Sequence, residues 1–98
     1  MNETKTKKLI AKSIIIATKV LCGGYQPSYF TIANIIAKVQ TLHNSLDMAD
    51  KQEYSYALCD IIVMLEIVDS IRVSNVTSHF DKLQELIIKA QNFLQYEL

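Results

Sequence analysis

The chain has few of the residues that interrupt secondary structure or cross-link small domains through disulfides. Its 98 residues include two Gly, one Pro, two Cys and no Trp. So little Gly and Pro predicts long regular elements. Cys22 and Cys59 are too few for a disulfide framework and too far apart for a metal knuckle. Both have apolar neighbours, so we expect them to be buried as small hydrophobic side chains. Half of the residues are hydrophobic, which is enough for the core of one domain, 1–98.

Arginine is also scarce, since Arg72 is the only one. Ten basic and ten acidic residues give a net charge of zero, and this composition argues against nucleic-acid binding. The balance hides a split, because residues 1–46 carry a net charge of +5 and residues 47–98 a net charge of −5. Either the two halves attract each other within the fold, or the basic half faces an anionic membrane or partner.

No apolar run approaches the roughly 20 residues that a membrane-spanning helix needs. The run LIAKSIIIATKVL is similar to the apolar part of a signal peptide, but Lys12 and Lys19 interrupt it and no small-residue cleavage site follows. We therefore expect a cytoplasmic protein. The Lys-rich face of this segment is either a solvated helix face or a site of peripheral contact with anionic lipid.

Apolar residues recur every three or four positions, which is typical of amphipathic helices. Four helices are predicted from this pattern, from the break at Gly23–Gly24, and from helix caps at Ser28 and at Thr77 or Ser78. These helices span about 4–21, 28–46, 51–71 and 78–96. Short connections make neighbouring helices antiparallel, so the predicted fold class is all-α, an antiparallel four-helix bundle. The predicted core comprises Leu9, Ile10, Ile14, Ile16, Ala17, Val20, Leu21, Ile32, Ile35, Ile36, Val39, Leu42, Leu46, Tyr54, Ala57, Leu58, Ile61, Leu65, Val68, Leu83, Leu86, Ile87, Ala90 and Leu94.

The third helix carries a second apolar row beside its core stripe. Tyr56, Val63 and Ile67 surround Asp60, and spacings of four, three and four place them on one flank. Either this flank packs on another helix with Asp60 satisfied locally, or it receives a partner helix or a second copy of the chain. A carboxylate there would reject partners that leave it unpaired. The predicted partner-binding residues are Tyr56, Asp60, Val63, Ile67 and Arg72.

Patterns that indicate catalysis are sparse. Glu66 and Asp69 are three residues apart, similar to one of the two carboxylate pairs in all-α metal-dependent nucleotide pyrophosphatases. The helix at 28–46 has no acid that could complete a magnesium site. Neither cysteine has an identifiable histidine partner in sequence. The sequence thus predicts a non-catalytic interaction protein with no cofactor or metal. A pyrophosphatase-like enzyme and a structural homodimer are the alternatives.

The layout resembles the immunity proteins that protect producers of class IIa (pediocin-like) bacteriocins. The similarity lies in chain length, a Lys-rich first helix, four antiparallel helices, and a third helix ending in the basic, polar segment Ser70-Ile71-Arg72-Val73-Ser74 before a capped last helix. In that family, discrimination between partners lies largely in the C-terminal half. The resemblance implies that helix three, the break at 72–78 and helix four hold specificity for a protein partner that the chain neutralises or regulates.

Overall fold

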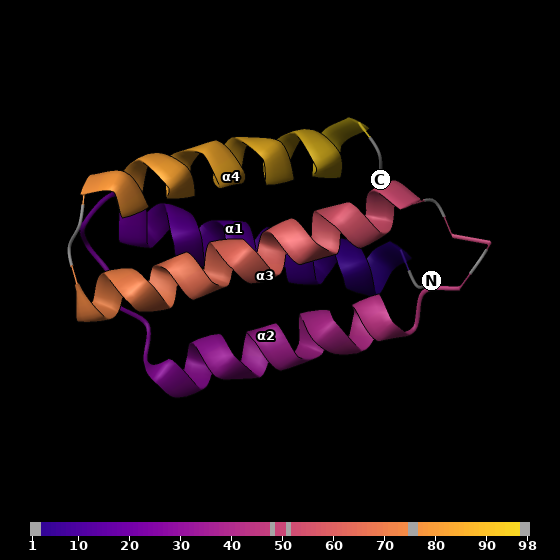
Figure 1. Ribbon diagram of the computed structural model, residues 1–98, viewed down its shortest axis with the longest axis horizontal. Coiled ribbons are helices and arrows are strands. Elements are labelled where there is room, and N and C mark those ends of the chain that lie inside the picture. The colour runs from indigo at the N-terminus through magenta and orange to yellow at the C-terminus, as the bar shows by residue number, and fades with distance from the viewer. Residues whose placement is uncertain (1–2, 48, 51, 75–76, 97–98) are drawn as a thin grey trace.

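The computed structural model describes residues 3–47, 49–50, 52–74 and 77–96, which form four antiparallel helices (Figure 1). They are α1 Glu3–Leu21, α2 Tyr29–Asn44, α3 Gln52–Val73 and α4 Thr77–Tyr96. The predicted all-α four-helix bundle is confirmed. None of these helices is long and apolar enough to cross a bilayer in the part of the chain that is described.

The first connection forms as the sequence predicts. Gly23 has a φ of +82°, the left-handed conformation that ends a helix at low cost only for glycine. Its amide donates to the carbonyl of Val20 at 3.0 Å. At the start of α2, the Ser28 hydroxyl accepts a hydrogen bond from the amide of Thr31 at 3.1 Å. Ser28 is therefore the N-cap of α2.

Two helix ends differ from the predicted ones. α2 stops at Asn44 and not near Leu46, because the Ser45 hydroxyl donates to the carbonyl of Leu42 at 2.7 Å and tightens the last turn. α3 continues to Val73, beyond the predicted end at 71, because the amide of Ser74 still bonds to the carbonyl of Ser70 at 2.8 Å. The cap predicted at Thr77 or Ser78 was also wrong, because α4 begins at Thr77 and both residues are helical; residues 75–76 lie outside the described part.

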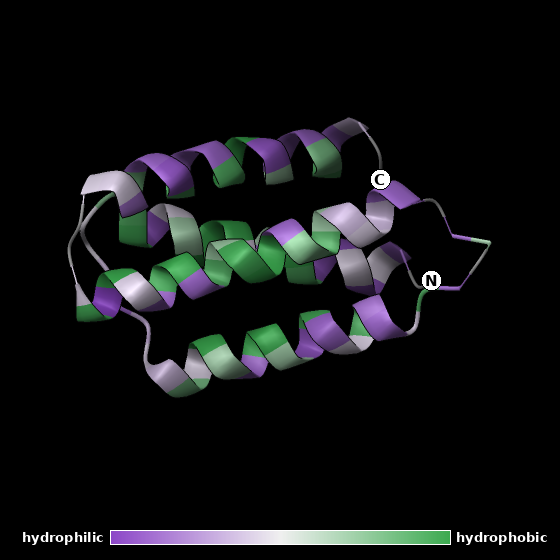
Figure 2. Ribbon diagram, viewed as in Figure 1, coloured by the Kyte–Doolittle hydropathy of each residue, from purple (hydrophilic) through white to green (hydrophobic). Residues whose placement is uncertain are grey.

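The bundle is flattened, with principal extents of 40 × 26 × 18 Å. α1 and α3 contact each other across the middle, and each also contacts α2 and α4. α2 and α4 lie at opposite edges (Figure 1). Because α3 touches every other helix, it needs apolar residues on more than one stripe. Figure 2 shows hydrophobic residues over most of α3, whereas on α4 they alternate with hydrophilic ones.

The predicted core is largely confirmed. Within it, Leu21, Ile36, Leu46, Tyr54, Ala57 and Leu94 are half-buried, and the others are buried. The prediction missed Met64 and Ile71, two further buried residues of α3. It also missed two buried polar residues of α1, Thr6 and Ser13. The Ser13 hydroxyl donates to the carbonyl of Leu9 at 2.8 Å, so its burial leaves no unpaired donor.

Candidate interaction surfaces

The predicted row on α3, here called the α3 ridge (Tyr56, Asp60, Val63 and Ile67), is partly open to solvent. Tyr56 is 60% exposed and Val63 is 41% exposed. Ile67 is half-buried and packs against the core. Neither alternative from the sequence describes the whole ridge. Tyr56 and Val63 face solvent, whereas Ile67 packs against the core.

Asp60 is not an isolated charge within the ridge. Its Oδ2 atom lies 3.1 Å from the ammonium nitrogen of Lys89 on α4. The Asp60 side chain is about one-third exposed and that of Lys89 more than half exposed, so water screens the pair. The ridge therefore presents an ion pair flanked by two exposed apolar side chains.

Arg72 lies apart from the α3 ridge. Its Nε atom donates to Oδ1 of Asp69 at 3.0 Å, and its guanidinium carbon is 6.0 Å from the ring centroid of Tyr29 on α2. The ridge, by contrast, is tied to α4 through Asp60. The structure thus brings together four of the five predicted partner-binding residues and places the fifth on the flank of α3 that faces α2.

Two exposed aromatic residues at the start of α2 were not predicted as surface features. Phe30 is 82% exposed and Tyr29 is also exposed, and their rings meet edge to face with centroids 5.9 Å apart. The signal in the sequence was their position: both follow the cap Ser28 directly and precede the apolar stripe that begins at Ile32. Large aromatic side chains outside a core stripe are candidates for contact with another surface.

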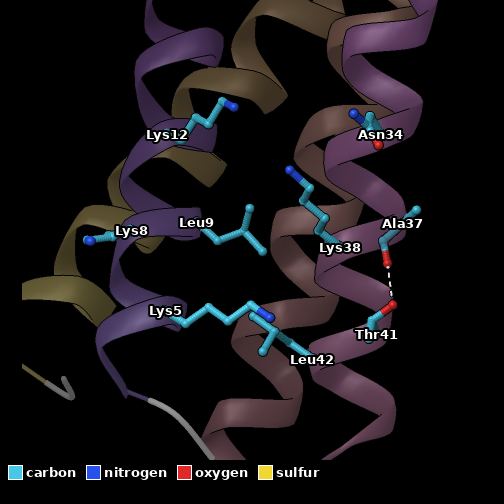
Figure 3. A pocket seen from close by; sticks show the side chains of 9 residues that line it. All are labelled: Lys5, Lys8, Leu9, Lys12, Asn34, Ala37, Lys38, Thr41 and Leu42. Carbon is cyan, nitrogen blue, oxygen red and sulfur yellow. Dashed lines mark hydrogen bonds between the residues drawn. The ribbon is translucent and has the colours of Figure 1, made fainter.

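A basic groove runs between α1 and α2 (Figure 3). Its volume is about 400 Å³. It is lined by Lys5, Lys8, Leu9, Lys12, Asn34, Ala37, Lys38, Thr41 and Leu42. Figure 3 shows Lys12 and Lys38 reaching into the space between the helices, with Leu9 between the two walls and Lys8 at the outer edge. Four lysines and no acid line this groove.

The carboxylates Glu66 and Asp69 lie in a second groove, of about 380 Å³, between α2 and α3. Asp69 is held by the ion pair with Arg72 at 3.0 Å. Within residues 3–47, 49–50, 52–74 and 77–96, no three His, Cys, Asp or Glu side chains are grouped so that they could hold a metal ion. In this part of the chain, the structure therefore places no further metal-binding side chain beside Glu66 and Asp69.

The expectation that both cysteines are buried was wrong. Cys22 and Cys59 are both exposed. Cys59 on α3 also has a histidine neighbour, because its Sγ atom is 3.6 Å from Nε2 of His43 on α2. The same nitrogen lies 2.9 Å from the Ser55 hydroxyl. His43 thus takes part in polar contacts that join α2 to α3 at the edge of the core.

Comparison with known proteins found no match: no family model, no curated protein and no solved structure is similar enough to this chain to report.

Proposed function

We propose that this chain is a non-catalytic interaction protein that receives an amphipathic helix of a protein partner on the α3 ridge. The observation that carries the proposal is the exposure of Tyr56 and Val63 on either side of the Asp60–Lys89 ion pair. Tyr is frequent at the centres of protein interfaces, because it buries much area and loses little side-chain freedom. Tyr56 and Val63 are seven positions apart, about two helical turns, which suits contacts along a docked helix.

The ion pair supplies selectivity in this proposal. A correct partner covers Asp60 and Lys89 together and leaves neither charge without its counter-ion. A partner with a misplaced charge breaks the pair and buries one uncompensated charge, at a cost of several kcal/mol, roughly 3–5. The ridge also lies in the C-terminal half, where the resemblance to class IIa bacteriocin immunity proteins places partner discrimination. Bacteriocin immunity in the cytoplasm is therefore one specific form of the proposal.

The test is capture of the partner from the native host with purified variants. Tyr56→Ala combined with Val63→Ser is expected to lose the partner and to remain folded, because neither side chain is buried in the core. Ile88→Ser is the matched control, since Ile88 is an equally exposed apolar residue on α4. Loss of the partner in the control, or retention in the double variant, would refute the assignment of the ridge.

Two further measurements test the alternatives, and a third tests immunity. Sedimentation at low and high protein concentration tests for a homodimer, and a dimer that Tyr56→Ala dissociates would assign the ridge to a second copy of the chain. Calorimetric titration with Mg²⁺ and a nucleotide tests for a pyrophosphatase-like enzyme through Glu66 and Asp69. Growth of a bacteriocin-sensitive strain that produces the chain, in the presence of a pediocin-like bacteriocin, tests immunity directly.

A further inference from the structure

The strongest charge feature of the molecule lies away from the α3 ridge, on α1 and α2. Residues 4–46 contain six lysines and no acid. Four of the lysines line the basic groove. Lys8, Lys12 and Lys38 have no ion-pair partner in the described part of the chain. Positive charge on this side of the molecule is thus open to an external anion.

Apolar residues continue both walls of the groove. On α1, residues 5, 8, 12, 15 and 19 recur at intervals of three and four, so Ile15 lies on the same stripe as the lysines. On α2, Phe30 lies four residues before Asn34, which lines the groove. Ile15 is 54% exposed and Phe30 is 82% exposed. A face that carries positive charge and protruding apolar side chains has the composition of a membrane-surface contact.

We infer that this face, here called the basic face (Lys8, Lys12, Ile15, Lys19, Phe30 and Lys38), docks on the surface of a membrane that contains anionic phospholipid. The lysines would contact the phosphate-bearing headgroups, and Ile15 and Phe30 would enter the boundary between headgroups and acyl chains. This inference does not rest on the proposed function, because none of these residues belongs to the α3 ridge.

Two observations favour a lipid surface over an acidic protein, and a third concerns the orientation of the molecule on an anionic surface. The cations are all lysines, whose flexible stems follow mobile headgroups, whereas fixed bidentate recognition of carboxylates is typical of arginine. Phe30 protrudes into solvent and is not recessed in a pocket that a partner side chain could fill. Acids are concentrated in residues 47–98, so anionic lipid attracts one side of the molecule and repels the other.

The first test is flotation of the purified chain with vesicles of phosphatidylcholine, with and without phosphatidylserine. Binding is expected only when phosphatidylserine is present, and it is expected to weaken as the salt concentration rises. Lys12→Gln and Lys38→Gln are each expected to lower the partition coefficient about fivefold. Lys7→Gln is the matched control, because Lys7 is an exposed lysine of α1 off this stripe, and it is expected to change binding by less than about twofold.

The second test uses the absence of tryptophan from the chain. Phe30→Trp introduces a single tryptophan on the basic face, and Ile88→Trp introduces one at an exposed position of α4; excitation at the red edge avoids the tyrosines. Anionic vesicles are expected to shift the emission of Phe30→Trp to shorter wavelength and to leave Ile88→Trp unchanged, because only the first side chain leaves water.

The inference is overturned by equal binding to both kinds of vesicle, by no binding to either, or by equal losses for Lys7→Gln and Lys12→Gln. It is also overturned when the chain binds polyglutamate and no vesicle, which would assign the face to an acidic protein. Thermal melting of each variant, followed by circular dichroism, shows that a loss of binding does not come from unfolding.

Discussion

Two valines of α3 offer a direct measurement of how the α3 ridge is oriented. Val63 is 41% exposed and Val68 is 1% exposed, so Val→Ala at the two positions removes the same atoms from opposite environments. At Val68 the loss of two buried methyl groups costs about 1.6 kcal/mol in transfer free energy. The cavity left behind raises the total to roughly 2–3 kcal/mol. For a domain of this length the melting temperature should fall by about 10–20 °C.

At Val63 two smaller effects oppose each other. Alanine favours a helix over valine by about 0.5 kcal/mol, because valine loses side-chain freedom against the preceding turn. Loss of the partly buried methyl groups costs a similar amount, so the net change should stay within about 0.5 kcal/mol. Urea or thermal unfolding followed by circular dichroism measures both variants. Equal destabilisation at the two positions would show that the α3 ridge is part of the core, and the proposed docking site would be lost.

Three other expectations concern local structure. Gly23→Ala should destabilise the protein by about 1–2 kcal/mol, because the φ of Gly23 is positive. Gly24→Ala should have little effect, since the φ of Gly24 is not positive and nothing lies within 4 Å of an added Cβ. Thermal melts of the two variants measure the difference. Ser28→Ala should cost about 1 kcal/mol through loss of the α2 cap, and Ser28→Asp should restore most of that stability. Cys22 and Cys59 should both react with a thiol reagent in the folded protein without denaturant, and protection of either until unfolding would contradict its exposure.

The periodicity of the sequence was sufficient for the fold. Long stripes at intervals of three and four identified all four helices, and local signals such as Gly23 and Ser28 set the ends of the first connection. The helix ends that were predicted wrongly depend on weaker local interactions. Ser45 competes with its own backbone for a carbonyl, and α3 continues two residues past its apolar stripe. Neither choice leaves a periodic trace in the sequence.

The candidate site was only partly predictable, because its contacts join distant segments. The spacing of the α3 ridge indicated its flank correctly, but the partner of Asp60 depends on the register between α3 and α4, and Lys89 is 29 positions away. Arg72 was predicted from the basic, polar segment at 70–74 that carries the resemblance, and not from the spacing of the α3 ridge. It is five positions from Ile67, about 140° around a helix, and it faces Tyr29 on α2. The cysteines illustrate the same point, since a step of about 100° separates buried Leu58 from exposed Cys59.

The division of charge between the halves of the chain is also a division between helices, since α1 and α2 belong to the basic half and α3 and α4 to the acidic half. In the described part of the chain, the ion pairs Arg72–Asp69, Lys82–Glu85 and Lys89–Asp60 each join two residues of the acidic second half, and Lys5 and Asp50 have interactions of their own besides these. If the two halves attracted each other, Lys12 and Lys38 would be expected to point toward acids of α3 or α4. Instead, both line a groove whose charged residues are all lysines. Holding like charges together across a groove is unfavourable, because each lysine raises the potential at the next. The anionic headgroups proposed above would relieve that repulsion, so anionic vesicles are expected to raise the melting temperature of the protein.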